Sequence, residues 1–168
     1  YRLEVLTGIR PGELRGLRVE DIEGERVNIR RSINVHGETT KGKNENAVRS
    51  FVLSDLAREE LEAQLREHPS ESGFVFELPH QVTYRKHWQR YCSHNKIAPV
   101  TLYELRHTFV SVAKMLPVGE VKQLVGHSKS MDTFGVYGHA LDGEDVQTAQ
   151  KINGLFERII SPEKPAEK

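Results

Sequence analysis

The chain carries YELRHT at residues 103–108 and GHS at residues 126–128, and a tyrosine follows at position 137. These segments bring Arg106, His107, His127 and Tyr137 into one short stretch, on or just after helices predicted at 102–115 and 118–125. Phosphoryl transfer requires fixed positive donors around the phosphate and a nucleophile aimed at it. The pattern therefore predicts cleavage of a phosphodiester through a tyrosine.

Length and composition indicate one soluble globular domain. The chain has 168 residues, of which 37% are hydrophobic and 29% charged, enough to bury a core without disulfides. Its single cysteine, Cys92, predicts a free thiol in a reducing cytoplasm rather than a catalytic one. The sequence shows no signal peptide and no apolar run near the roughly 20 residues of a membrane span. Because Tyr1 starts inside a predicted helix without a methionine, we expect a fragment of a longer protein.

Charge is balanced over the whole chain but not along it. The formal net charge is zero. Residues 80–137 hold eight basic and three acidic side chains, whereas residues 54–79 hold two basic and seven acidic ones. A basic face with an acidic back is compatible with a phosphate-rich partner, although many solvated surfaces share this pattern.

Apolar periodicity predicts a mainly α fold with a small antiparallel β-sheet (α+β), in one domain over residues 1–160. Helices are expected at 1–6, 11–17, 54–68, 80–94, 102–115, 118–125 and 144–160, and strands near 27–35 and 48–53. The polar segment 37–46 predicts a hairpin tip that carries Lys41 and Lys43. Residues 161–168 are short, charged and contain proline, so we expect a disordered tail.

Two arginines and a tyrosine supply the groups that this chemistry needs. Arg10 stands at a helix start, where backbone N–H groups also favour phosphate, and Arg106 lies on a second helix. Arginine suits this task because its planar fork contacts two phosphate oxygens at once. A tyrosine nucleophile forms a phosphotyrosine that stores the energy of the broken bond, so the hydroxyl of another strand can reverse the reaction.

Five motifs, in this order, resemble those of the tyrosine recombinases, the phage-integrase family, over nearly the whole chain. They are TGIRPGEL at 7–14, Lys41 in the hairpin, LRHTF at 105–109, LVGHS at 124–128 and YGH at 137–139. The resemblance implies the tyrosine-recombinase catalytic-domain fold. It also implies site-specific DNA recombination by an integrase of a Gram-positive phage or integrative element.

The resemblance implies a catalytic role for each matching residue, with no cofactor and no metal. Arg10 and Arg106 would clamp the scissile phosphate. His127 would hydrogen-bond a nonbridging oxygen, and Tyr137 would attack to form a 3′-phosphotyrosine. The acid that protonates the 5′ hydroxyl would be Lys41.

Three further residues complete this expected site. Lys43 is the competing assignment for the acid, and Glu13 resembles the structural acid that steadies the active-site arginines. Position 103, usually histidine in the family, is Tyr103 here. Because a phenol with a pKa of about 10 is a poor base, we expect Tyr103 to orient the phosphate and to tune activity rather than abolish it.

The helix expected at 80–94 predicts a DNA-facing surface, with a plain solvated face as the alternative. Its aromatic residues recur at helical spacing and indicate a core face: Tyr84, Trp88 and Tyr91. Its histidines at 80, 87 and 94 are two turns apart, about 10 Å along the axis, too far to share one metal ion. The DNA contacts we expect are Arg85, Lys86 and Arg90 on this helix, with Lys43, Arg49 and His107 elsewhere.

The resemblance also implies partners and leaves alternatives open. We expect double-stranded DNA attachment sites, a homotetramer in the synaptic complex, a monomeric isolated fragment, accessory DNA-bending or directionality factors, and a nucleoid location in the bacterial cytoplasm. Arm- and core-binding domains would precede this chain. The amphipathic helix at 144–160 would pack on its own domain or dock onto a neighbouring protomer. The alternative functions are a chromosome-dimer resolvase, a DNA-binding module without catalysis, and a metallonuclease, which lacks clustered carboxylates here.

Overall fold

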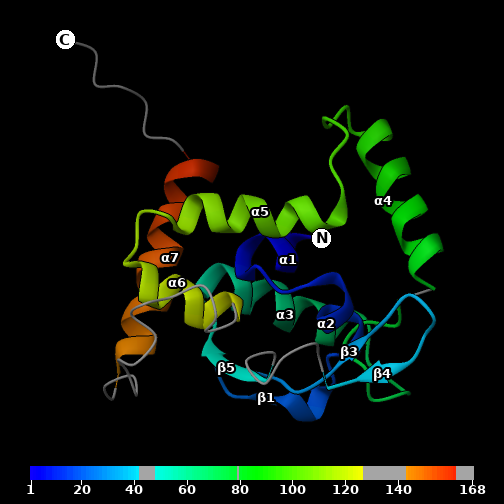
Figure 1. Ribbon diagram of the computed structural model, residues 1–168, viewed down its shortest axis with the longest axis horizontal. Coiled ribbons are helices and arrows are strands. Elements are labelled where there is room, and N and C mark those ends of the chain that lie inside the picture. Colours follow the sequence, from blue (N-terminus) through cyan, green and yellow to red (C-terminus); the bar gives the residue numbers. More distant parts are fainter. Residues whose placement is uncertain (42–47, 79, 127–142, 162–168) are drawn as a thin grey trace.

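The computed structural model describes residues 1–41, 48–78, 80–126 and 143–161. Within these ranges the chain is mostly helical, as the sequence predicts (Figure 1). The helices are α1 (Arg2–Thr7), α2 (Pro11–Gly16), α3 (Asp55–Glu67), α4 (Gln81–His94), α5 (Leu102–Ala113), α6 (Val118–Val125) and α7 (Glu144–Ile160), with a 3₁₀ turn at Val19–Asp21. The expected tail lies outside the described residues from position 162 onward.

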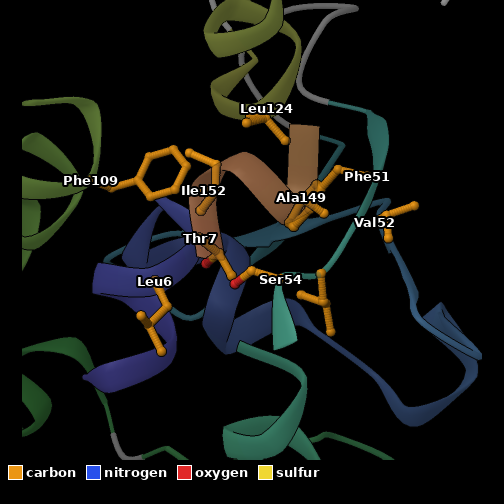
Figure 2. Close-up of a pocket in the computed structure, with 10 residues that line it drawn as sticks. Leu6, Thr7, Phe51, Val52, Ser54, Phe109, Leu124, Ala149 and Ile152 are labelled. Carbon is orange, nitrogen blue, oxygen red and sulfur yellow. The ribbon is translucent and has the colours of Figure 1, made fainter. Parts of the chain in front are cut away.

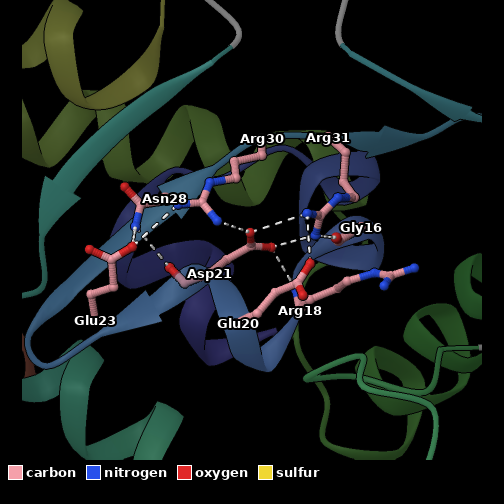
Figure 3. Close-up of polar contacts among 8 residues, drawn as sticks. All are labelled: Gly16, Arg18, Glu20, Asp21, Glu23, Asn28, Arg30 and Arg31. Atoms are coloured by element: carbon pink, nitrogen blue, oxygen red, sulfur yellow. Dashed lines mark hydrogen bonds and ion pairs between the residues drawn. The ribbon is translucent and has the colours of Figure 1, made fainter.

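The strands form two small antiparallel sheets rather than the single sheet that the sequence suggested. One sheet has the order β1 (Ile22–Glu23), β2 (Arg26–Ile29), β5 (Arg49–Val52), and the other pairs β3 (Ser32–Ile33) with β4 (Thr39–Thr40). The chain leaves the first sheet after Ile29, where Arg30 and Arg31 pair with the buried carboxylate of Asp21 (Figure 3). The hairpin β3–β4 packs instead on α2.

Helix α5 lies across the middle of the molecule and packs on α1, while α6 and α7 lie at its other end (Figure 1). Phe109 of α5 is 1% exposed and stacks on Phe156 of α7, with ring centroids 6.2 Å apart. Burying such side chains is the main stabilising contribution to the fold. This core connects α1, α5 and α7, and it therefore holds the start of the chain against its last helix.

A second, smaller core lies between α4 and the start of α5. Tyr84 and Trp88 are buried there, as the aromatic spacing predicts, and Cys92 is a buried free thiol. Tyr91 differs: it stacks on Trp88 but remains 47% exposed. The aromatic face of α4 therefore attaches this helix to α1 and α5, and its opposite face remains open to solvent.

Helix α7 packs on its own domain, one of the two arrangements left open by the sequence. Its buried residues include Ala149, Ile152 and Phe156, and Asn153 accepts a hydrogen bond from the Leu56 amide at 2.9 Å. A small cavity of about 10 Å³ remains where α7 meets α1, β5 and α6 (Figure 2). A space of this size holds one water at most, so we treat it as a packing gap and not as a ligand site.

Two further absences concern only the part of the chain that the structure describes. None of its helices combines the length and apolar character needed to cross a membrane. No group of three or more histidine, cysteine or acidic side chains gathers there in a way that would hold a metal ion.

Candidate active site

Three arginines converge on the C-terminal end of α6, immediately before His127. Arg49 donates to the carbonyl of Leu124 at 2.7 Å, Arg106 to that of Val125 at 2.6 Å, and Arg10 to that of Gly126 at 3.0 Å. The last carbonyls of a helix lack intrahelical donors and carry the negative end of the helix dipole, so cations are favoured there. Side chains from three distant segments thus hold three consecutive peptide groups.

Glycine 126 makes this end of α6 possible. It is the C-cap residue in the left-handed conformation, with φ 65°, and its amide donates to the Lys122 carbonyl at 2.9 Å. A residue with a Cβ adopts this conformation only at a cost. The chain therefore turns sharply at Gly126, with its carbonyl directed to Arg10.

The carboxylate of Glu13 holds two of these arginines. Arg49 binds it with both terminal nitrogens at 2.9 Å, and Arg10 donates to it from its side chain at 2.6 Å and from its backbone N–H at 2.9 Å. Such bidentate pairing fixes orientation as well as distance. Burial acts to raise the pKa of Glu13, but the hydrogen bonds and charges of Arg49 and Arg10 outweigh it and hold the pKa below its ordinary value.

Arg106 is the most deeply buried of the three arginines, at 2% exposure. It lies on α5, whose N-cap is Thr101. The Thr101 hydroxyl accepts a hydrogen bond from the Glu104 amide. Its other terminal nitrogen donates to the Gly8 carbonyl at 2.6 Å, so it joins α5 to the end of α1 as well as to α6. Burial lowers the pKa of Arg106 to about 10, and the charges of Arg10 and Arg49 act in the same direction.

A cleft of about 930 Å³ opens beside this cluster. Arg10, whose side chain is 30% exposed, lines it together with Tyr103, Gly126 and Thr40. Arg106 lies behind this wall and does not line the cleft. The cleft therefore presents the partly exposed guanidinium of Arg10, the Glu13 carboxylate that pairs with it, the Tyr103 phenol and the His36 imidazole, while Arg106 lies behind its wall.

The structure brings several of the predicted catalytic residues together. Arg10 and Arg106 meet at adjacent carbonyls of α6, and Tyr103 lines the same cleft as Arg10. Lys41 is exposed and directly follows the cleft-lining Thr40. The predicted nucleophile and phosphate-binding histidine, Tyr137 and His127, lie outside the described residues, as does Lys43.

The predicted DNA-contacting residues lie in two different environments. Arg85, Lys86 and Arg90 are exposed on α4, and His107 is exposed on α5, where its ring meets Tyr103 edge-on at 5.1 Å. Arg49 is only 6% exposed in its side chain. Its guanidinium faces Glu13 and α6, a position that suits support of the site better than a contact with DNA.

A strand pattern indicates the inward position of Arg49. Side chains two apart in a strand share a face, and Arg49 is two residues before the buried Phe51 in β5. Its guanidinium carbon lies 6.0 Å from the centre of that ring. The spacing in β5 therefore favours the buried face for Arg49. A lone arginine at the start of a strand nevertheless resembles a solvated edge residue.

The charges at this site do not cancel. Among the described residues, Glu13 is the one carboxylate that faces Arg10, Arg49 and Arg106, and the carbonyls that these arginines bind there are neutral. A positive surplus at the wall of a concave surface attracts anions, and planar guanidinium groups match the geometry of a phosphate. The arrangement is suited to binding a phosphodiester.

Comparisons with known proteins agree with this chemistry. The Phage integrase family matches residues 1–144. The ICEBs1 integrase of Bacillus subtilis (strain 168) is 25% identical over 183 aligned positions, which cover 93% of this chain and 48% of that protein. The chain thus spans about half the length of this relative.

Solved structures share the fold at low sequence identity. The Tn1549 transposon integrase in complex with transposon right end DNA has a TM-score of 0.64 at 20% identity, over 86% of this chain and 55% of that one. The same integrase in complex with circular intermediate DNA has a TM-score of 0.64 at 19% identity, over 94% and 58%. Since the family match extends over most of the sequence and includes every element of the arginine cluster, the chain belongs to the phage integrase family.

Proposed function

We propose that this chain is the catalytic domain of a site-specific recombinase that cuts and rejoins DNA during integration or excision of a mobile element. The convergence of Arg10, Arg49 and Arg106 beside an open cleft is the observation that carries the proposal. Family membership supports the same chemistry, and the similar proteins named above are integrases of mobile elements. The activity needs neither a metal nor a nucleotide cofactor.

The reaction would proceed in one displacement at phosphorus. The phenol oxygen of Tyr137 attacks the scissile phosphate, and the bond from phosphorus to the 5′ oxygen breaks. Lys41 gives its proton to the departing 5′ oxygen, while Arg10 and His127 stabilise the charge on the nonbridging oxygens. The products are a 3′-phosphotyrosine and a free 5′ hydroxyl. The 5′ hydroxyl of another strand then attacks the phosphotyrosine, which forms a new phosphodiester and releases Tyr137.

We propose other roles for Tyr103, which lines the cleft, and for Arg106, which lies behind its wall. Since Tyr103 is a poor base, water accepts the phenol proton of Tyr137. The Tyr103 hydroxyl donates a hydrogen bond to the phosphate. Arg106 would act from beneath, by fixing the peptide groups of Val125 and Gly8 and by adding positive charge. Any direct contact between Arg106 and the phosphate requires a change from the buried arrangement seen here.

The DNA would extend over the basic face of α4. Arg85, Lys86 and Arg90 are exposed on this helix, outside its buried face of Tyr84, Trp88 and Cys92. Contacts from such residues to the DNA backbone position a protein without reading sequence. We also propose the homotetrameric synapse of the family, with accessory factors, in the cytoplasm of a bacterial host.

Covalent capture tests the proposed function. Nicked duplexes tiled across the DNA that flanks the gene are incubated with the full-length protein in EDTA, and adducts are separated on denaturing gels. We expect a protein–DNA adduct through the 3′ phosphate that is absent in Tyr137→Phe. Binding of these duplexes with no adduct from the wild-type protein would instead indicate a DNA-binding module without catalysis.

A further inference from the structure

We propose that Arg15 is a positioning residue for the leaving-group acid. It fixes the β3–β4 hairpin, and with it Lys41, against the helix that carries Arg10 and Glu13. This inference rests on the function proposed above, because it gives Arg15 a part in the same reaction.

Arg15 is a buried cation whose side-chain hydrogen bonds, among the described residues, are with the hairpin. It is 8% exposed, and one terminal nitrogen donates to the carbonyl of Asn34 at 2.9 Å and approaches that of Ile33 at 3.5 Å. Among the described residues no carboxylate pairs with it, and its Nε has no hydrogen-bond partner. Burying an arginine without a counter-charge costs free energy. We infer that the hairpin position that Arg15 stabilises offsets this cost.

Asn34 is the residue on which the turn of the hairpin is built. Its side-chain oxygen accepts from the amides of His36 at 2.9 Å and Glu38 at 3.0 Å, and its own amide donates to the Glu38 carbonyl at 3.0 Å. The Asn34 carbonyl that Arg15 binds also accepts from the Gly37 amide at 3.1 Å, so Arg15 binds a group that is itself part of the turn. Displacing Asn34 would displace the whole turn.

The turn is connected to Lys41 through β4. Ser32 pairs with Thr40, whose hydroxyl donates to the Ser32 carbonyl at 3.2 Å, and Lys41 is the next residue. A two-stranded hairpin of this length is marginal on its own. Its position must therefore come from the element on which it packs, which is α2.

Helix α2 is shaped to receive the hairpin. A Cβ on Gly12 would lie 2.5 Å from the Ser32 hydroxyl and 2.9 Å from the Ile33 carbonyl, so only glycine permits this close approach. Gly12 and Arg15 are three residues apart and share one face of the helix. Arg10 and Glu13, at the start of the same helix, hold the arginine cluster. One short helix therefore sets the distance between the phosphate-binding side chains and the acid.

The chemistry of the leaving group separates positioning of the acid from general loss of structure. A 5′ oxygen needs a proton as its bond to phosphorus breaks, and a correctly placed acid contributes about 10²–10⁴ in rate. A sulfur in the same bridging position leaves as a thiolate, because thiols have a pKa of about 8.5. Defects that act through Lys41 should therefore disappear on the sulfur-bridged substrate.

The experiment compares the two substrates in the full-length protein with the nicked duplexes described above. Arg15→Met keeps the apolar stem and removes the charge. We expect adduct formation to slow by about 10–100-fold on the oxygen substrate, within the range of acid catalysis, and to return close to the wild-type rate on the sulfur substrate. Lys41→Ala should show the same pattern.

The matched control is Arg18→Met. Arg18 belongs to the same segment, and its guanidinium lies over the Phe74 ring, 4.8 Å from its centre, with no contact to the hairpin among the described residues. We expect this variant to change both substrates by the same factor. If Arg15→Met unfolds, Arg15→Lys, which keeps a cation near the carbonyls, is measured in the same way and should show a smaller defect that sulfur also removes.

The outcomes distinguish this proposal from the function on which it rests. Equal slowing of Arg15→Met on both substrates, or no slowing on either, overturns the positioning role while wild-type adducts sustain the proposed function. Absence of any wild-type adduct with either substrate overturns the proposed function, and the role of Arg15 with it.

Discussion

Glu13 and Asp21 are two buried carboxylates built in the same way, yet only one of them lies at the candidate active site. Each accepts a hydrogen bond at 2.9 Å from the amide of an arginine three residues earlier, Arg10 or Arg18. They are 3% and 1% exposed. The guanidinium groups around them are those of Arg10 and Arg49 at Glu13, and of Arg30 and Arg31 at Asp21.

The difference lies in what else the arginines bind. Around Asp21 they continue to two surface acids, Glu20 and Glu23, so three carboxylates face two guanidinium groups (Figure 3). Around Glu13 the third cation is Arg106, and within the described residues the arginines also donate to neutral carbonyls of α6. The same pairing therefore produces a closed structural network in one place and a positive surplus in the other. That surplus is what an anionic substrate can use.

The largest effect is expected for Glu13→Gln. It leaves three arginines close together without their carboxylate, and breaking a buried ion pair on one side costs about 3–5 kcal/mol. Urea unfolding monitored by circular dichroism measures the loss of unfolding free energy. A loss below about 1 kcal/mol, the range of exposed pairs, would show that Glu13 does not hold the cluster.

Asp21→Asn should separate stability from activity. We expect a loss of about 2–3 kcal/mol in unfolding free energy, smaller than for Glu13 because Arg30 is 47% exposed in its side chain and can be solvated. The rate of adduct formation per folded molecule should match the wild type, since the side chain of Asp21 pairs with Arg30 and Arg31 and not with the arginine cluster in the part of the chain that the structure describes. A selective loss of that rate would remove the distinction between the two carboxylates.

Glu4 is a third buried carboxylate, and it has no arginine partner among the described residues. It is 0% exposed, accepts one hydrogen bond from the Tyr84 hydroxyl at 2.8 Å, and its other oxygen has no partner there. Burial raises the pKa of Glu4 from 4.5 to about 7, against the smaller opposing effect of Tyr84. The buried site thus favours the protonated acid.

This raised pKa gives a pH-dependent prediction. The folded protein keeps the Glu4 proton to higher pH than the unfolded chain, so the wild type loses stability as the pH rises from 4.5 to about 7. Glu4→Gln mimics the protonated form and should be more stable than the wild type at pH 8, by on the order of 2 kcal/mol. The advantage should shrink toward pH 4.5. An advantage that does not vary with pH would exclude titration of Glu4 as its cause.

The smallest effect concerns the positive surplus itself. Inorganic sulfate should bind beside Arg10 and raise the melting temperature by about 1–3 °C. Arg10→Gln should lose most of this increase, whereas Arg30→Gln, at the Asp21 network, should keep it. An equal increase in both variants would mean that sulfate acts on the solvent and not at the cleft.

Much of the fold followed from local patterns. Helix starts such as Pro11, which favours the first turn, and Ser54, whose hydroxyl accepts a backbone N–H of that turn, act within a few residues, so their sequence positions predict the elements directly. The division of the strands into two sheets was not predictable in the same way. At the point of division Arg30 and Arg31 pair with Asp21, about ten residues away along the chain.

The sequence by itself determined the family motifs, the order of the helices and the types of residue at the site, because these depend on spacing and chemistry along the chain. Only the tertiary structure decided that Arg49 pairs with Glu13, that Arg106 lies beneath the cleft wall, and that Arg15 reaches Asn34. Each of these contacts joins residues 19 to 98 positions apart. Whether a charged side chain meets solvent or a distant carbonyl depends on packing between elements, which no local pattern specifies.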